Sequence, residues 1–436
     1  MSEWKVTELK NIILAHRPVT YGIVQPGPDI RPNGIPLIRG KDYSSGKVDS
    51  SDLYHVKPEI DLPYKRSKVL GGDILFSIAG YVGQVAIVPQ SLEGANITQT
   101  TARISVNTNS YSSAYIFYYL ISDFTQTQVR KYAKGSAQEG LNLSDVEKIR
   151  INFPSLQPQF KIAHILSTID SVIEKTQSAI DKYKAIKQGM LHDLFTRGID
   201  IKTGKLRPRY QEAPELYKES KLGWIPNEWE IKEIGNVSSL VTNGFVGIAT
   251  PYYTTADKGV PYLYGTNIRE DSIEFNDLRY ISREFNNSHI KSQLKPGDML
   301  CVQSGHIGTC AVVPDNFVEA NCHALIITRF YKEIIYPEFI SFYLNSSIGQ
   351  HHLDKIIIGS TIKHINTSDL AKHLIPIPLF EEQKEISRRL LVIDQKLRTE
   401  QNYFHKLQML KSGLMSDLLS GKKRVKVDNE DLSKTA

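Results

Sequence analysis

Cysteine and histidine side chains gather in one part of the chain, where their chemistry would suit a zinc ion. They are Cys301, His306, Cys310, Cys322 and His323. Protein zinc sites place such ligands at short fixed spacings, for example Cys-x-x-Cys or His-x-x-x-His, and this group has neither. An internal repeat, described below, aligns the three cysteines with the apolar residues Phe76, Val85 and Ile97. We therefore expect buried cysteines that pack as small apolar side chains, and no metal site.

Two further stretches could bind the target amine of a methyl transfer or a nucleotide. Asp61-Leu62-Pro63-Tyr64 approaches the Asn/Asp/Ser-Pro-Pro-aromatic loop of amino-methyltransferases. It lacks one proline, its repeat counterpart Asn286 to His289 has nothing similar, and no glycine-rich AdoMet loop follows a strand. Gly198 to Lys205 is one residue too long for a Walker A loop, and Leu206 replaces the hydroxyl residue that would hold magnesium. We expect no catalytic site on this chain.

Length, charge and cysteine content set broader limits. A chain of 436 residues is long enough for two or three domains, each with its own core. The net charge of +6 and the isoelectric point near 8.9 permit a polyanionic partner but do not require one. Three cysteines rule out a disulfide framework. The N-terminal stretch has no apolar signal core and no apolar run approaches a membrane span, so we expect a cytoplasmic protein.

The chain repeats itself, which decides its organisation. Trp229 follows its counterpart Trp4 by 225 residues, and beyond Asn96 and Asn321 the offset falls to 224. Matching phrases include Gly72-Asp73-Ile74-Leu75 with Gly297-Asp298-Met299-Leu300, Gly80–Gly83 with Gly305–Gly308, Tyr115–Leu120 with Phe339–Leu344, and Gly135-Ser136 with Gly359-Ser360. Each copy has strand-like alternating runs, such as Asp73–Ile78 and Val85–Val88, and an amphipathic helix at Tyr115–Leu120. Each copy is therefore expected to be one mixed α/β domain.

A long helical stretch follows each copy, and apolar residues recur in it at steps of four and three. The two stripes are Ile162, Leu166, Ile169, Ile173 and Ile180, and Ile386, Leu390, Ile393, Leu397 and Phe404. This spacing predicts a coiled coil. Polar residues interrupt both stripes at equivalent places, Thr176 with Glu400 and Lys187 with Lys411. At the lysines we expect the preceding apolar residues, Ile186 and Leu410, to carry the stripe onward.

These observations predict a mixed α/β (α+β) fold with two repeated globular domains, each followed by a long α-helix. We expect the two helices to pack as an antiparallel coiled coil. The expected parts are a first globular domain (1–155), a central helix (156–197), a linker rich in proline, glycine and charge (198–223), a second globular domain (224–379), a C-terminal helix (380–420) and a charged tail without regular structure (421–436).

Two phrases carry a resemblance to a known family: Met190 to Ile199 (MLHDLFTRGI) and Leu222 to Pro226 (LGWIP). With the repeated arm-and-helix pattern, the chain resembles the specificity subunits of type I restriction-modification enzymes over nearly its whole length. The resemblance implies that each globular domain is a target recognition domain, reading one half of a bipartite, asymmetric double-stranded DNA sequence. It implies that the helices hold two methyltransferase subunits and, through them, restriction (translocase) subunits. AdoMet, ATP and Mg are then expected on those partners, with no cofactor on this chain and N6-methyladenine as the partner's product.

Residues that touch DNA are best sought where the repeat keeps a glycine turn but changes the side chain, because a turn brings side chains close to base edges and phosphates. In the first copy these are Arg39, Lys41, Tyr81, Gln99, Lys134, Ser136 and Gln138. In the second they are Tyr264, Thr266, Asn267, His306, Ser360, Thr361, Lys363 and His364. Two other functions stay open, a two-armed protein-binding scaffold and a stand-alone DNA methyltransferase. Salt-sensitive DNA binding and an AdoMet-binding assay would distinguish them.

Overall fold

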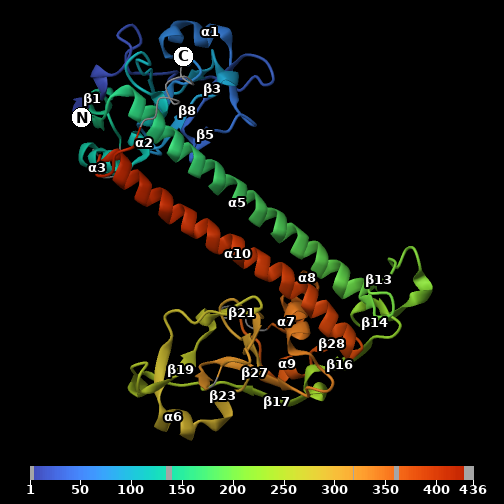
Figure 1. Ribbon diagram of the computed structural model, residues 1–436. Helices are drawn as coiled ribbons and strands as arrows, with labels where there is room; N and C mark the ends of the chain where they lie inside the picture. The colour runs from blue at the N-terminus through green and yellow to red at the C-terminus, as the bar shows by residue number, and fades with distance from the viewer. Residues whose placement is uncertain (1–3, 134–139, 318, 358–362, 427–436) are drawn as a thin grey trace. The chain divides into compact units, whose positions relative to one another are not determined.

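The structure is a computed structural model that describes residues 4–133, 140–317, 319–357 and 363–426. It divides into two compact units, unit 1 (residues 1–177 and 402–436) and unit 2 (residues 178–401), each described by itself below. Helices α5 (Leu156–Arg197) and α10 (Phe380–Leu419) both pass from one unit into the other (Figure 1). We call residues 4–155 the first arm and residues 224–379 the second arm.

The first arm is built on two sheets. The larger has the strand order β2-β10-β7-β8-β5-β4, with β2 (Thr20–Tyr21), β10 (Thr101–Ile104), β7 (Ile74–Ser77), β8 (Val85–Ile87), β5 (Gly46–Val48) and β4 (Tyr43–Ser44). The smaller has the order β6-β3-β9, with β6 (Tyr54–Val56), β3 (Ile35–Ile38) and β9 (Asn96–Ile97). β1 (Lys5–Glu8) pairs antiparallel with β11 (Arg150–Phe153), which leads into α5. The helices are α1 (Pro58–Asp61), α2 (Ser113–Ile121), α3 (Asp123–Tyr132) and α4 (Leu143–Glu147).

Local sequence explains the central elements of this arm. All four residues of β7 are buried. Gly72 before the strand and Gly80 after it adopt the left-handed backbone conformation (φ 86° and 76°), which glycine adopts without a steric penalty. Helix α2 begins at Ser112, whose hydroxyl accepts a hydrogen bond from the backbone N–H of Tyr115. The run Tyr115–Leu120 is buried throughout, so the predicted helix and its assignment to the core are confirmed.

The second arm repeats this construction. One sheet has the order β17-β27-β24-β25, with β17 (Ser238–Asn243), β27 (Leu325–Phe330), β24 (Met299–Val302) and β25 (Cys310–Val312). The other has the order β18-β22-β19-β26-β23, with β18 (Tyr253–Thr254), β22 (Arg279–Ser282), β19 (Gly259–Leu263), β26 (Ala320–Cys322) and β23 (Gln293–Leu294). Two short pairs complete it: β16 (Glu230–Glu233) with β28 (Leu374–Ile377), and β20 (Ile268–Arg269) with β21 (Ser272–Ile273). The helices are α6 (Arg283–Ser288), α7 (Pro337–Asn345), α8 (Ser347–Leu353) and α9 (Thr367–Ala371).

One buried glutamine fastens each arm to its long helix in the same way. In unit 1, Gln159 donates to the carbonyl of Pro154 (2.9 Å) and accepts from the N–H of Ser112 (2.9 Å). In unit 2, Gln383 donates to the carbonyl of Pro378 (3.0 Å) and accepts from the N–H of Tyr336 (2.9 Å). The repeat therefore extends from sequence phrases to equivalent hydrogen bonds.

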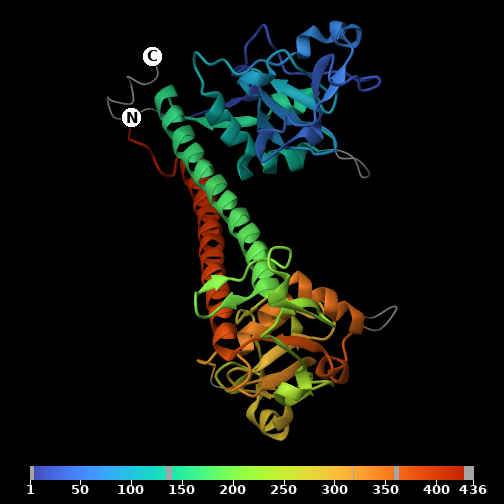
Figure 2. The same cartoon turned by 90° about the vertical axis from the view of Figure 1, so that its right-hand side faces the viewer.

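Helices α5 and α10 pack antiparallel, as predicted, and lie side by side within each unit in both views (Figures 1 and 2). In unit 1, the N-terminal part of α5 shares a core with Leu418 and Leu419. In unit 2, Leu191 and Leu194 share a core with the N-terminal part of α10. All ten predicted seam residues are buried or half-buried: Ile162, Leu166, Ile169, Ile173, Ile180, Ile386, Leu390, Ile393, Leu397 and Phe404.

The expected detour of the stripe around the lysines is wrong. Ile186 and Leu410 are 38% and 53% exposed, whereas Lys187 is only 9% exposed. The lysines keep the inward positions because each has a carboxylate on the facing helix. Lys187 Nζ lies 2.7 Å from Asp394 Oδ1 in unit 2, and Lys411 Nζ lies 2.5 Å from Asp170 Oδ1 in unit 1. A lysine that is paired with a carboxylate can therefore occupy a buried position in the seam, although the apolar residue before it would be the expected choice.

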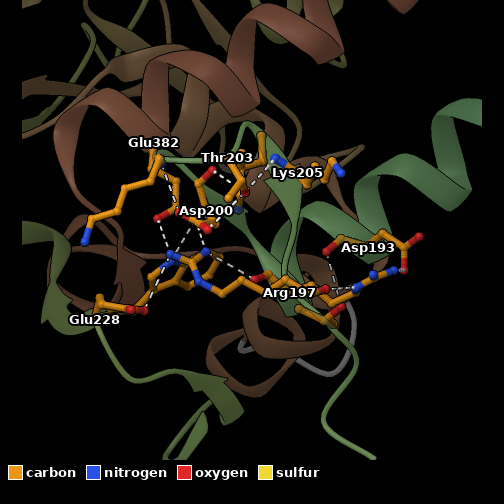
Figure 3. Close-up of polar contacts among 12 residues, drawn as sticks. Asp193, Arg197, Asp200, Thr203, Lys205, Glu228 and Glu382 are labelled. Atoms are coloured by element: carbon orange, nitrogen blue, oxygen red, sulfur yellow. Dashed lines mark hydrogen bonds and ion pairs between the residues drawn. The ribbon is translucent and has the colours of Figure 1, made fainter. Parts of the chain in front are cut away.

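The stretch expected to be a plain linker contains two hairpins. They are β12 (Ile199–Asp200) with β13 (Lys205–Leu206), and β14 (Tyr217–Ser220) with β15 (Gly223–Pro226). A buried ion pair holds the first hairpin to the start of α10: Glu382 accepts from Arg207 Nη1 (2.6 Å) and Nη2 (3.1 Å), from the N–H of Ile199 (2.7 Å) and from the indole of Trp229 (3.2 Å) (Figure 3). We call these contacts the clasp. The repeat places Pro158 opposite Glu382, so the first half has no carboxylate there.

The start of the charged tail is not free of contacts. Val425 packs against the core of the first arm, and Gly421 lies against the ring of Trp4. The rest of the expected tail, residues 427–436, lies outside the described part of the chain. None of the described helices is both long and apolar enough to cross a membrane.

Candidate nucleic-acid interface

Each arm has a hollow, and the two hollows overlap in part when the repeat is aligned. The first hollow, of about 520 Å3, is lined by Tyr21, Val24, Ile78, Ala79, Gln99, Thr100, Gly140, Leu141, Asn142 and Leu143. The second hollow, of about 410 Å3, is lined by Tyr264, Gly265, Thr266, Asn267, Asp277, Arg279, Val302, Ser304, Gly305, His306, His323 and Ala324. Three lining positions correspond: Ala79 with Ser304, Gln99 with His323, and Thr100 with Ala324. The two hollows therefore overlap at these three positions, where the side chains differ, and extend over different parts of the two arms.

The shared Gly-x-x-Gly turns follow Ala79 and Ser304, which line the two hollows. The backbone conformation of these turns requires glycine. Gly80 and Gly83 have φ of 76° and 86°, and Gly305 and Gly308 have φ of 86° and 81°. The side chain that follows the first glycine is turned outward in both arms. Tyr81 is 53% exposed, and His306 is also exposed, with its Nε2 3.2 Å from the carbonyl oxygen of Ile268.

A tight turn after β3, and its copy after β19, carries the next candidates. Asp42 accepts a hydrogen bond from the N–H of Arg39 (2.9 Å), and Asn267 accepts one from the N–H of Tyr264 (2.9 Å). Asp42 and Asn267 are 9% and 8% exposed, so both side chains support the turn from inside. The predicted DNA contact of Asn267 therefore falls on a capping residue, whereas Lys41 and Thr266, in the same turns, are exposed.

A cation–π pair beside this turn has exchanged partners between the arms. In the first arm, the guanidinium of Arg39 lies over the ring of Tyr54 at 5.1 Å. The repeat places Tyr264 at the position of Arg39 and Arg279 at that of Tyr54. There, the guanidinium of Arg279 lies over the ring of Tyr264 at 5.2 Å. The same attraction is kept with the charge moved to the other strand.

Sequence reasoning missed Arg279, although it singled out Tyr264. The search required a glycine turn beside each candidate, and Arg279 starts β22 without one. The available signal was the compensating exchange of Arg39 and Tyr54 for Tyr264 and Arg279. Burial, followed by the charge of Arg279, lowers the pKa of His323 in the same hollow.

The remaining candidates are placed as follows. Gln99 and Lys363 are exposed, and His364 forms a β-bridge with Ser304 beside the second hollow. Five predicted contacts lie outside the described residues: Lys134, Ser136, Gln138, Ser360 and Thr361. Contact of any of these residues with DNA stays a prediction.

The stretch that resembles a methyltransferase loop has a structural role. Asp61 is 5% exposed, forms an ion pair with Lys68 (2.8 Å) and accepts from the amide of Asn96 (2.8 Å). In the second arm, the counterpart Asn286 accepts from the amide of Asn321 (3.0 Å). Since both copies use this position to hold a strand, Asp61 is accounted for without a substrate amine.

The three cysteines are fully buried and free, as the repeat predicts. Cys301 and Cys310 face one another across β24 and β25, and Cys322 packs in a neighbouring apolar cluster. Within the described ranges, no group of three or more His, Cys, Asp or Glu side chains is placed to hold a metal ion.

Two copies of one α/β domain, each with a hollow and each leading into one helix of an antiparallel coiled coil, define a two-armed class of protein. The sequence matches the family described as "Type I restriction modification DNA specificity domain" over residues 1–182 and 226–409. The chain belongs to this family of type I restriction-modification specificity subunits, which are DNA-binding proteins.

Individual relatives agree with this assignment. The chain is 36% identical over 197 residues to the EcoBI type I restriction enzyme specificity subunit of Escherichia coli, covering 44% of this chain and 41% of that protein. A Methanocaldococcus jannaschii protein, provisionally assigned as the MjaX type I restriction enzyme specificity subunit, is 27% identical over 435 residues, 97% of this chain and 94% of its own length. The crystal structure of the S subunit of a type I restriction-modification system from M. genitalium has a TM-score of 0.61 at 14% identity, covering 98% of this chain and 97% of that one.

Proposed function

We propose that this chain is the non-catalytic subunit that selects the DNA sequence of a type I restriction-modification complex. Each arm reads one half of a bipartite, asymmetric target. One observation carries the proposal: the hollows of the two arms overlap in the repeat, and the positions that they share carry different side chains, Gln99 against His323 being one example. Related but unequal readers suit two unequal half-sites better than a palindrome.

The same proposal includes partners. Two methyltransferase subunits bind the paired helices, and restriction subunits join through them in the cytoplasm. Exposed apolar side chains on α10 support a protein partner there: Leu391, Val392, Tyr403, Met409 and Leu410. AdoMet, and ATP with Mg for restriction, belong to those partners, and the methylated product is N6-methyladenine.

Methylome sequencing of cells that carry the gene, or lack it, tests the proposal directly. We expect one asymmetric, bipartite methylated sequence that depends on the gene. Substituting the exposed pair Thr266→Ala and His306→Ala should change only one half of that sequence, since both residues line the second hollow. A change in both halves at once would contradict independent reading by the arms.

A protein-binding scaffold would behave differently in solution. Purified chain with its methyltransferase partner should bind duplex DNA with an affinity that falls steeply as salt rises, because phosphate contacts release counterions. Absence of sequence-dependent methylation together with salt-independent association with another protein would favour the scaffold.

A further inference from the structure

The two arginines of the exchanged cation–π pair differ in how their charge is compensated. Arg39 donates to both carboxylate oxygens of Asp42, at 2.8 Å and 2.9 Å. Arg279 donates to the phenol oxygen of Tyr253 at 2.9 Å and has no carboxylate within 4.0 Å among the described residues. The first arginine is paired with a carboxylate within its own arm, whereas the second has no ion-pair partner among the described residues.

Aromatic rings hold the Arg279 guanidinium in one orientation. Its central carbon lies 5.3 Å from the ring centre of Tyr253 and 5.2 Å from that of Tyr264, and the two phenol groups are hydrogen-bonded to each other. Tyr264 is supported in turn by the edge of Tyr262 at 5.2 Å and by His323 at 4.9 Å. The backbone of Arg279 belongs to β22, which pairs with β19 inside the five-stranded sheet. A planar donor fork fixed in this way loses little side-chain entropy on binding.

We propose that Arg279 reads a guanine base in the half-site of the second arm, an inference that rests on the proposed function. The guanine edge in the major groove presents two acceptors, O6 and N7, which match the parallel donors of a guanidinium. Asp277 lines the same hollow and has an exposed side chain. Its carboxylate can accept from the amino group of the cytosine paired with that guanine. The first arm has no equivalent reader, because its arginine is bound to Asp42.

A base contact fits this geometry better than a phosphate contact. An arginine can bind a phosphate with two parallel hydrogen bonds, but a lysine also binds it as a point charge, so a phosphate contact does not require a fixed planar fork. Arg279 instead lies against the rings of Tyr253 and Tyr264 and shares its hollow with donor and acceptor side chains of several kinds, Thr266, Asp277 and His306. Such a mixed lining suits a base edge, whose pattern of donors and acceptors differs between base pairs.

The substitution Arg279→Lys separates the two contacts, because it keeps the charge and removes the planar fork. The complete methyltransferase complex containing this variant is bound to a duplex library in which each position of both half-sites is randomised in turn. We expect wild-type protein to prefer guanine at one position of the second half-site by roughly 5- to 150-fold, and the variant to lose that preference there alone. Preference in the first half-site stays intact and reports that the complex is folded. Arg283→Lys is the matched control, because Arg283 is exposed on the adjoining helix and pairs with Glu319 at 2.9 Å.

The outcomes are distinguishable. If the Arg279→Lys variant keeps every base preference, or if Arg279→Ala weakens binding equally for all sequences and makes the salt dependence shallower, the residue contacts phosphate and the inference is wrong. If wild-type complex shows no base preference in either half-site, the proposed function itself fails.

Discussion

Lys187 on α5 donates to Asp394 on α10 at 2.7 Å. The internal repeat gives an equivalent ion pair in which α10 carries the lysine and α5 the aspartate. Asp394 follows Asp170 by 224 residues, and Lys411 follows Lys187 by the same number. Lys411 on α10 accordingly lies 2.5 Å from Asp170 on α5. The two lysine breaks in the seam are therefore one interaction used twice. They fix the antiparallel register, since a heptad slip would leave both lysines without their carboxylates.

Removing the two lysines should have unequal effects. Lys187 has an 11% exposed side chain and also faces the buried carboxylate of Asp271 at 3.4 Å. Lys187→Met leaves two buried carboxylates without a cation and should destabilise unit 2 by about 3–5 kcal/mol. Lys411→Met is the matched control, because both partners of its pair are about one quarter exposed. We expect a loss of about 1 kcal/mol or less there. Urea denaturation of both variants measures the difference, and equal losses would contradict the argument.

The second arm should become less stable as pH rises through the range in which Asp271 ionises. Burial raises the pKa of Asp271 to about 6 from an ordinary value of 3.8, while Lys187 and the donors Ser341 (2.8 Å) and Asn345 (2.7 Å) act in the opposite direction. A carboxyl group with a raised folded-state pKa contributes stability that is complete below the unfolded-state pKa and is lost as pH rises to the folded-state value. The contribution is about 3 kcal/mol at about 1.4 kcal/mol per pKa unit.

Asp271→Asn should remove this dependence, because an amide does not ionise. The measurement is the unfolding free energy of wild-type protein minus that of the variant, taken by urea denaturation between pH 4 and pH 7. We expect that difference to fall as pH rises from about 4 to about 6 and then to level off. Parallel pH profiles for the two proteins would show that Asp271 titrates alike in both states.

The helices, their seam and the buried strands were predictable from the sequence because apolar spacing and glycine turns act locally. Lys187 was interpreted as a break in the stripe, which Ile186 was expected to carry onward, because its partners Asp271 and Asp394 lie far away in sequence. Charges that pair across the fold are invisible to such a pattern. The stretch 198–223 was interpreted as a plain linker for the same reason, because the ion pair of Arg207 with Glu382 joins residues that are distant in sequence.

The clasp should depend on the charge of Glu382. The side chain of Glu382 is completely buried, and that of its partner Arg207 is 9% exposed. Glu382→Gln leaves the guanidinium with only the exposed carboxylate of Glu228, 3.5 Å away, and should destabilise unit 2 by about 3–5 kcal/mol. Its neighbour offers the control, because Glu381 is 70% exposed and pairs with Lys384 at 3.1 Å. Glu381→Gln should cost less than about 1 kcal/mol.

Limited proteolysis locates the effect of opening the clasp. The first hairpin, β12 with β13, should become accessible between Gly198 and Arg207 in the Glu382→Gln variant, because an amide has neither the charge nor the second acceptor oxygen that hold Arg207. The Glu381→Gln variant should be cut at the wild-type rate. Unchanged cleavage in both variants would mean that backbone pairing alone holds the hairpin.

The final prediction concerns the gap between half-sites, and it rests on the proposed function. Seven residues inserted after Ile180 and seven after Phe404 lengthen both helices between the two lysine–aspartate pairs, so the seam and both pairs are kept. Each helix grows by about 10 Å at about 1.5 Å per residue. This length corresponds to about three base pairs at about 3.4 Å each. The doubly extended protein should prefer a longer gap between unchanged half-sites, with weaker binding because three base pairs also rotate the second half-site by roughly a quarter turn or more. Selection on duplex libraries with fixed half-sites and variable gaps measures this preference.

Insertion after Ile180 alone is the control, since it makes one of the two ion pairs impossible and should destabilise the coiled coil. A folded double-insertion protein that retains the wild-type gap preference would show that the helices do not set the spacing.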